Sequence, residues 1–416
     1  MSLQLLTGFG NEKSPDFSAW SVAVAIKSTV SMDFVWLYRP VGMAIGSVKR
    51  RAAAGVALLA LATASPAAAA SPAPGAAWQK VAPATAGLDA SKLAQIAAVA
   101  RKGHSNCLVV VRDGKLAGEW YFNGTGPDTA QDVFSATKSF ASTLVGIAQD
   151  DGDLRIGDSA STWIPQWKGT PSQAVTVRNL LSMDSGRKWD VVTDYLRLLA
   201  APNRTAFAIG RGQAAAPGTV WAYNNSAVQT LDRVLAKATG QNVAAFARRR
   251  IFAPLGMAHT TMTTDKAGNA QLFEGIRSTC RDMARFGVLM LNHGNWRGKQ
   301  IVSASWVRQA TAVSSTKLNA AYGYLWWLNH EGVMASVTAA TSLKAVAQGT
   351  TETGRMVPGA PGSMYWALGL GNQLIQIDPA SRTVVVRLGT AAAIPLPPTF
   401  GPAEASEIVT RALVRR

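Results

Sequence analysis

The sequence predicts an α+β fold in which an antiparallel sheet, flanked by helices, is joined to an all-helical lobe. Two stretches rich in β-branched residues, 107–112 and 383–387, lie near opposite ends of the chain. Between about residues 150 and 270, apolar residues recur at helical spacing, and Gly and Pro separate the segments. Because strands from both ends can join one sheet, this order predicts a sheet assembled from the two termini with a helical insert between them.

Each element can be identified in turn from its periodicity. A helix at 88–100 precedes a hairpin, because Asp113-Gly114 is a strong turn signal between the strands 107–112 and 116–122. Residues 133–147 again show helical spacing. The remaining expectations are helices at 177–183, 226–239, 243–252, 279–291, 303–312 and 403–414, and a second hairpin formed by strands 374–378 and 383–387.

Residues 49–71 are typical of a targeting leader. A basic cluster at 49–51 is followed by an apolar run at 52–64 and by Ala68-Ala69-Ala70, which are the three parts of a secretory signal peptide. The apolar run is too short to span about 30 Å of hydrocarbon, so we expect no stable membrane anchor. The protein is therefore predicted to be exported, either to the periplasm or out of the cell.

This leader sets the predicted domain boundaries. Residues 1–42 are an upstream extension outside the mature protein, because Met43 is a plausible start, and residues 43–70 are the signal peptide. Residues 71–83 form an Ala/Pro-rich lead-in. The sheet domain comprises 84–149 and 271–416, and the helical domain comprises 150–270.

Composition excludes several classes of function. The formal net charge is +17, but Lys and Arg are scattered and form no stripe interleaved with aromatic residues, so we expect no nucleic-acid partner. The four histidines and two cysteines lack metal-ligand spacing, and we expect neither a metal nor a cofactor. Cys107 and Cys280 can form a disulfide in an oxidising compartment or remain as two buried thiols, and the sequence leaves both open.

The spacing Ser-x-x-Lys indicates a candidate nucleophile with its base. A serine hydroxyl needs a neighbouring base, and residues three apart share one face of a helix. The spacing occurs three times, at Ser135/Lys138, Ser185/Lys188 and Ser314/Lys317. Only Ser135 opens an apolar helix, whereas the other two lie in polar sequence typical of the surface. We predict that Ser135 is the nucleophile and that Lys138 is its base, kept neutral by a desolvated pocket.

A second pattern, Tyr223-x-Asn225, follows in the helical lobe behind Pro-Gly at 217–218. A tyrosine near a Ser–Lys pair can pass protons to the leaving group, and an asparagine two residues later can hold the lysine and a substrate carbonyl. Residues 121–123 have the same form, so the pattern alone is weak. Its position after the Ser-x-x-Lys helix is what favours Tyr223 and Asn225.

Several segments together resemble the serine β-lactamase/penicillin-binding-protein superfamily, and within it the class C-like branch of esterases and 6-aminohexanoate-dimer hydrolases. The segments are LVVVRDGKLAGEWYFNG, FSATKSFAST, VTVRNLLSMDSG, PGTVWAYNN, IFAPLGM, RDMARFG and LGLGNQLIQIDP. The resemblance covers nearly all of residues 75–415. It implies an active site in the cleft between the sheet domain and the helical lobe, with Ser135 as nucleophile, Lys138 as base, Tyr223 as proton shuttle and Asn225 as a substrate-binding residue.

The chain departs from this superfamily at one motif. Members active on β-lactams carry Lys-Thr-Gly or His-Thr-Gly on the strand that lines the pocket, whereas residues 367–369 of this chain are Ala-Leu-Gly. The resemblance implies that the backbone N–H of Leu370 joins that of Ser135 as an oxyanion hole. The strand lacks the cation that would bind a substrate carboxylate, which puts β-lactamase and D,D-peptidase activity in doubt.

Further cleft residues follow from the same resemblance. Tyr195 is expected to cap a substrate amide, although an aromatic side chain that packs a loop explains it equally well. Trp189, Asp190 and Arg277 are weaker candidates for the lining, and Trp326 and Trp327 are expected in the core or in the cleft wall.

The sequence therefore predicts a serine hydrolase that cleaves small esters or amides through an acyl-serine intermediate. A β-lactamase or D,D-peptidase is the first alternative, and a non-catalytic binding protein of the cell envelope is the second. A Ser-His-Asp triad is disfavoured, because the chain has no Gly-x-Ser-x-Gly turn.

Overall fold

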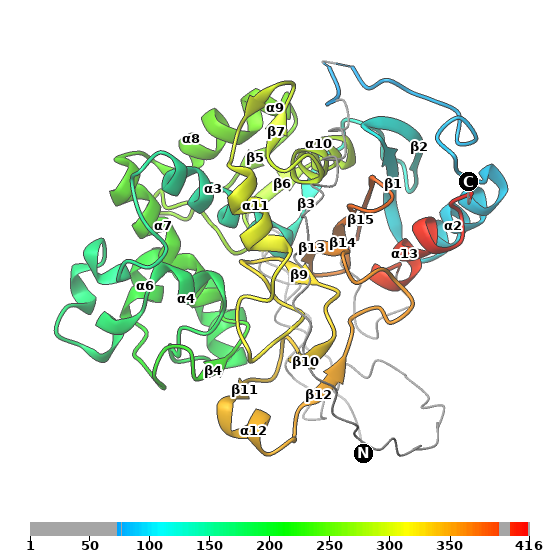
Figure 1. Cartoon of the computed structure of the whole chain (residues 1–416). Coiled ribbons are helices and arrows are strands. Elements are labelled where there is room, and N and C mark those ends of the chain that lie inside the picture. Colours follow the sequence, from blue (N-terminus) through cyan, green and yellow to red (C-terminus); the bar gives the residue numbers. More distant parts are fainter. Residues whose placement is uncertain (1–72, 76, 391–399, 415–416) are drawn as a thin grey trace, which may run out of the picture.

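A six-stranded antiparallel sheet forms the centre of the computed structural model, which describes residues 73–75, 77–390 and 400–414 (Figure 1). The predicted upstream extension and signal peptide lie outside the described residues. The strand order is β2-β1-β15-β14-β13-β9, so strands from near both ends of the chain lie side by side. These strands are β1 (Ser105–Arg112), β2 (Lys115–Tyr121), β9 (Trp327–Leu328), β13 (Tyr365–Gly369), β14 (Gln373–Asp378) and β15 (Thr383–Gly389).

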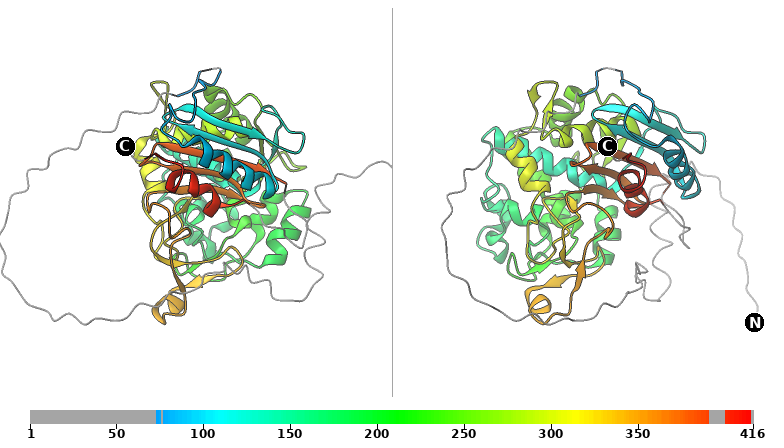
Figure 2. Two further views of the ribbon diagram at one scale, coloured as in Figure 1. Left: turned by 90° about the vertical axis from the view of Figure 1, so that its right-hand side faces the viewer. Right: turned by 45° about the vertical axis from the view of Figure 1, so that its right-hand side comes forward.

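The alternation along β1 shows how the sheet separates two cores. Leu108 and Val110 pack beneath α2 (Ala90–Lys102) and α13 (Pro402–Thr410), which cover one face of the sheet (Figure 2). Val109 and Val111 belong to the larger core on the other face. Successive side chains of a strand point to opposite faces, so this run of buried residues serves both layers.

The opposite face of the sheet is covered by α10 (Cys280–Leu291) and, beyond it, by α3 (Thr137–Asp150) and the helical lobe. The helices of the lobe are α4 (Val177–Leu181), α5 (Leu198–Ala200), α6 (Arg204–Gly210), α7 (Asn225–Thr239), α8 (Val243–Ala247) and α9 (Ala253–Leu255). Two π-helical turns, Thr193–Arg197 and Arg248–Phe252, interrupt this series. The predicted α+β fold class is confirmed.

Short strands connect the lobe to the rest of the chain. β4 (Val220–Trp221) pairs with β11 (Thr341–Ser342), and β5 (Thr261–Met262) pairs with β6 (Ile276–Ser278). The lobe is therefore mainly, rather than entirely, helical. The remaining strands and α-helices are β3 (Gln131–Asp132), β7 (Asn295–Trp296), β8 (Lys299–Gln300), β10 (Gly332–Met334), β12 (Glu352–Gly354), α11 (Ala304–Thr311) and α12 (Leu343–Ala347), and three short 3₁₀ helices span Ala160–Thr162, Pro165–Trp167 and Pro171–Ala174.

Most of the expected elements are present, with two informative differences. The predicted hairpins are confirmed, and Asp113 and Gly114 both have positive φ (48° and 73°), as a tight two-residue turn requires. The predicted helix at 133–147 begins only at Thr137, because a short 3₁₀ turn precedes it. The α3 helix is also buried on all sides from Thr137 to Ala148, since it lies between the sheet and the lobe.

The two cysteines are joined. Cys107 on β1 and Cys280 at the start of α10 form a disulfide with an S–S distance of 2.07 Å, which links the sheet to the helix beneath it. Of the two possibilities that the sequence left open, the structure shows the disulfide. None of the helices in the described ranges combines the length and the apolar character needed to cross a membrane.

Candidate active site

Ser135 lies in a 3₁₀ turn, Phe134–Ala136, at the N-terminal end of α3. Phe134, the residue before it, has a positive φ of 47°, a conformation that bulky side chains rarely adopt. Such outliers concentrate at functional sites, where the surrounding structure holds them. Here Val133 N donates a hydrogen bond to Ile276 O (3.0 Å), so β6 fixes the residue that precedes Phe134.

Lys138 lies one turn further along α3 and is 1% exposed. Its Nζ donates to Ser135 Oγ and to the carbonyl oxygen of Phe273, both at 2.9 Å. Burial lowers the pKa of Lys138 to about 7, and the carboxylates of Glu274 and Asp194 oppose that shift. A lysine in these surroundings can be neutral near pH 7 and can accept a proton from the serine.

Tyr223 contacts the same pair from the lobe. The Lys138 ammonium lies 4.7 Å from the centroid of the Tyr223 ring, and Ser135 hydrogen-bonds the phenol oxygen. Complete burial raises the pKa of Tyr223 well above its usual value, and the hydrogen bond from Ser135 acts in the opposite direction. The ring stacks on Trp327 at 5.7 Å between centroids, which fixes its orientation. Tyr223 is therefore a protonated phenol at neutral pH.

Asn225 and Tyr195 meet beside this group. Asn225 is the first residue of α7 and is 3% exposed, and its side chain hydrogen-bonds Tyr195. The Oδ1 atom of Asn225 is buried without a hydrogen-bond partner among the described residues, so it retains the capacity to accept a hydrogen bond from a ligand. Burial and the charge of Asp194 raise the pKa of Tyr195 to about 12.

The end of β13 reaches the nucleophile. A Cβ atom on Gly369 would lie 2.1 Å from Val133 O and 3.2 Å from Ser135 N, so only glycine allows this approach. Leu370 follows at once and is 58% exposed, and its carbonyl oxygen accepts a hydrogen bond from Gln373 Nε2 (3.1 Å). The structure thus brings together Ser135, Lys138, Tyr195, Tyr223 and Asn225, and it places Leu370 directly after the glycine that approaches Ser135 N.

The weaker candidates have other contacts. Asp190 pairs with Arg211 (3.1 Å) and caps Thr193 N, and Arg277 pairs with Asp132 (3.3 Å) on the exposed side of β6. Trp326 is fully buried in the core, whereas Trp327 stacks on Tyr223. Trp189 is half-buried, and its Nε1 is a buried donor without a partner in the described part of the chain.

Three features of the site had no signal in the sequence. The carbonyl of Phe273 receives the second Lys138 hydrogen bond, and backbone atoms carry no motif. Glu274 is held by Arg204 (3.1 Å) and faces Lys138, and Asp194 contacts the start of α7. Both carboxylates lie far from Lys138 in sequence, so only the fold shows that they are neighbours.

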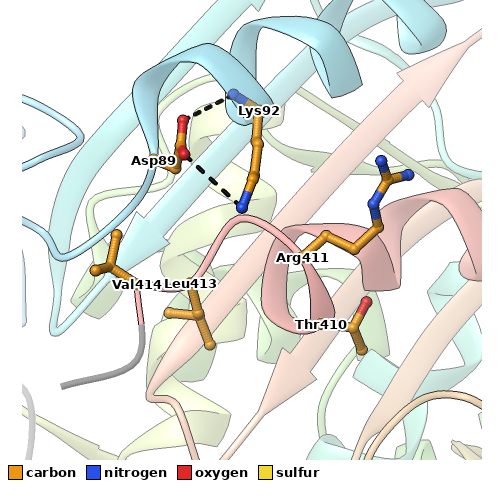
Figure 3. A pocket seen from close by; sticks show the side chains of 6 residues that line it. All are labelled: Asp89, Lys92, Thr410, Arg411, Leu413 and Val414. Carbon is orange, nitrogen blue, oxygen red and sulfur yellow. Dashed lines mark hydrogen bonds and ion pairs between the residues drawn. The ribbon is translucent and has the colours of Figure 1, made fainter.

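A hollow lies on the other side of the sheet, between α2 and the end of α13 (Figure 3). It is lined by Asp89, Lys92, Thr410, Arg411, Leu413 and Val414. The side chain of Asp89 accepts a hydrogen bond from Lys92 N (3.0 Å) and caps α2. The sheet separates this hollow from Ser135, so it is not part of the candidate site. Within the described ranges, no group of three or more His, Cys, Asp or Glu side chains is placed to hold a metal ion.

Comparison with known proteins gives one family. The family model described as Beta-lactamase matches residues 90–395. The 6-aminohexanoate-dimer hydrolase of Paenarthrobacter ureafaciens is 22% identical over 302 residues, which cover 69% of this chain and 72% of that protein. A beta-lactamase of Pseudomonas fluorescens is 26% identical over 167 residues, covering 37% of this chain and 44% of that protein.

Solved structures agree on the fold. The octameric penicillin-binding protein homologue from Pyrococcus abyssi superposes with a TM-score of 0.56 at 17% identity, covering 77% of this chain and 75% of that chain. At this identity the likeness concerns the fold alone.

Proposed function

This chain belongs to the beta-lactamase family of serine hydrolases, and we propose that it cleaves small esters or amides through an acyl-Ser135 intermediate. The observation that carries the proposal is the 2.9 Å hydrogen bond between Ser135 Oγ and Nζ of a fully buried lysine. A base that must take a proton at neutral pH needs a pKa near 7, and Lys138 meets this requirement.

The two pKa shifts distinguish the roles of Lys138 and Tyr223. A phenolate base would need a lowered pKa, whereas that of Tyr223 is raised by burial. Tyr223 therefore acts as a neutral proton relay, and Lys138 acts as the base.

The reaction balances with these groups alone. Ser135 Oγ forms a bond to the substrate carbonyl carbon while its proton moves to Lys138, and the backbone N–H groups of Ser135 and Leu370 stabilise the oxyanion. The proton then passes through Tyr223 to the leaving oxygen or nitrogen as the old bond breaks. Water repeats the sequence on the acyl-enzyme, giving the acid and restoring the Ser135 hydroxyl.

The end of β13 favours a neutral substrate. Ala367, Leu368 and Gly369 present no cation beside the nucleophile, and Leu370 adds an exposed apolar side chain. A buried or half-buried carboxylate needs a paired charge, so this wall suits an uncharged acyl group better than the carboxylate of a penicillin or a stem peptide.

The test is hydrolysis by residues 71–416, assayed on p-nitrophenyl esters of different chain lengths, on simple amides and ω-amino acid oligomers, and on nitrocefin. We expect ester or amide turnover, with loss of roughly 10³-fold or more in kcat for Ser135→Ala. Ser185→Ala is the matched control. Full activity in Ser135→Ala, or failure of a fluorophosphonate probe to label Ser135, would contradict the proposal. Nitrocefin turnover equal to ester turnover would point to a β-lactamase instead.

We further propose that the protein acts outside the cytoplasm on a small molecule, without a nucleic-acid partner or a stable membrane anchor. Two features support this location. The sequence at 49–70 is typical of a signal peptide, and the Cys107–Cys280 disulfide is a bond that persists in oxidising compartments. N-terminal sequencing of the exported protein would test the cleavage after residue 70.

A further inference from the structure

Asp194 lies outside α7, and its buried carboxylate hydrogen-bonds the first residues of that helix. It lies in the π-helical turn Thr193–Arg197 and is 1% exposed. One oxygen accepts from Asn225 N at 2.5 Å, and the other accepts from Ser226 N (3.1 Å) and Ser226 Oγ (2.6 Å). Three hydrogen bonds on one buried carboxylate leave little freedom between the two segments.

These contacts complete the N-terminus of α7. The first N–H groups of a helix have no partner within the helix. Asn224, the N-cap residue, supplies an acceptor for Ala227 N (2.7 Å), and Asp194 supplies acceptors for the two residues before it. Burial raises the pKa of Asp194, whereas the hydrogen bonds from Ser226 and Asn225 lower it, and the ionised carboxylate lies at the positive end of the helix dipole. The position of Asp194 in the π-helical turn therefore fixes where α7 begins relative to that turn.

Both segments joined in this way carry site residues. Tyr195 follows Asp194 directly, and the side chain of Tyr195 forms a hydrogen bond with that of Asn225. Tyr223 stands two residues before the first residue of α7. The mutual position of Tyr195, Tyr223 and Asn225 is thus set through one carboxylate that hydrogen-bonds the backbone of Asn225 and Ser226 and the hydroxyl of Ser226.

We propose that Asp194 is a positioning residue that fixes Tyr223 and Asn225 at the correct distance from the Ser135–Lys138 pair. This inference rests on the proposed function, because it assigns Asp194 a task in the same reaction. Asp194 does not touch the reacting atoms. It acts by holding the groups that do, and an error of about 1 Å in such groups can cost about 10²-fold in rate.

The charge of Asp194 has a second, separable effect on Lys138. The acidic groups that face Lys138 are Glu274, from the loop before β6, and Asp194, from the π-helical turn, and both raise its pKa against the effect of burial. The neutral phenols of Tyr223 and Tyr195 face the same space. Removing the Asp194 charge should therefore lower the pKa of Lys138, while Glu274, paired with Arg204, remains in place.

The experiment compares Asp194→Asn with two variants, using ester hydrolysis and fluorophosphonate labelling of Ser135 across pH. Asp194→Asn should lower kcat roughly 10²-fold, because an amide cannot accept all three hydrogen bonds, and it should move the acidic limb of kcat/KM to lower pH. Ser226→Ala, which keeps the charge and loses one hydrogen bond, should lower kcat about 10-fold without moving the limb. If Asp194→Asn does not fold, Ser226→Ala still tests the positioning role.

Asp232→Asn is the matched control. Asp232 is a buried carboxylate further along α7 that also bonds a hydroxyl and a backbone N–H, those of Thr205 (2.9 Å) and Ala270 (3.0 Å). We expect Asp232→Asn to lower thermal stability and to leave both kcat and the acidic limb of the kcat/KM profile unchanged. Wild-type kcat in both Asp194→Asn and Ser226→Ala would overturn the inference. An equal loss in Asp232→Asn would also overturn it, because the effect would then be general destabilisation. If activity is unaffected by Ser135→Ala, that result would instead contradict the proposed function itself.

Discussion

Two segments of this chain share the spacing Ser-x-x-Lys and differ in almost every other respect. Ser135 and Lys138 lie on one helical face, and their side chains are bonded at 2.9 Å. Ser185 is 2% exposed, contrary to the surface position that its polar sequence suggested, and its carbonyl oxygen accepts a hydrogen bond from Gln213 Nε2 (2.6 Å). Lys188, in contrast, is exposed to solvent.

The difference lies in the backbone between the two residues. In the first segment the chain continues as a helix, which returns residue i+3 to the side of residue i. In the second, Gly186 has a φ of 67° and turns the chain away. Spacing therefore specifies a pair only where the backbone is helical, and burial of the lysine is what makes the pair reactive.

The largest effect should come from replacing Lys138, with Lys188 as the control. Lys138→Met removes the base and should lower kcat by about 10²- to 10⁴-fold, whereas Lys188→Met should leave kcat unchanged. Lys138→Arg should be as inactive as Lys138→Met, because an arginine side chain does not release its proton. Steady-state ester hydrolysis measures all three. Comparable losses in the two methionine variants would contradict the distinction drawn between the segments.

The next effect concerns two glycines, Gly369, which approaches the Ser135 turn from β13, and Gly186, which lies inside the Ser185 segment. A Cβ on Gly369 would meet Val133 O at 2.1 Å, and one on Gly186 would meet Ala215 O at 2.3 Å. Gly369→Ala should displace the Ser135 turn and lower kcat about 10²-fold. Gly186→Ala should instead cost about 1–3 kcal/mol of unfolding free energy. Thermal denaturation together with kcat separates the two, and a Gly369→Ala enzyme with normal kcat would argue against the close approach.

The smallest effect is the pH dependence. Because Lys138 must be neutral to act and its pKa is about 7, kcat/KM should fall about tenfold for each pH unit below that value. Labelling of Ser135 by a fluorophosphonate should follow the same curve, and Ser185 should remain unlabelled at every pH. A labelling rate that is flat between pH 5 and 8 would show that another group is the base.

The sequence predicted the fold class and the reactive pair because both depend on local patterns. Alternating strands, the Asp113-Gly114 turn and the apolar helix after Ser135 are each specified within about fifteen residues of chain. The ordering of the Tyr223 segment behind that helix added the second part of the site.

The rest depended on contacts between distant segments. Asp194 and Asn225 become neighbours only when the π-helical turn packs against α7. A local sequence pattern does not indicate that a carboxylate caps a helix elsewhere in the chain. The Phe273 carbonyl is a backbone atom, and the positive φ of Phe134 goes against the preference of its own side chain. Tertiary packing imposes these features, so they escape a reading based on local propensity.

The pairing of β1 with β15 also has a consequence for the order in which the protein matures. During synthesis the nucleophile emerges early, but β13, with Gly369 and Leu370, and β15, the neighbour of β1, emerge more than two hundred residues later. Contacts of such long range form slowly. An incomplete chain therefore carries Ser135 without the strand that faces it, and hydrolytic activity becomes a direct sign that the C-terminal strands have joined the sheet.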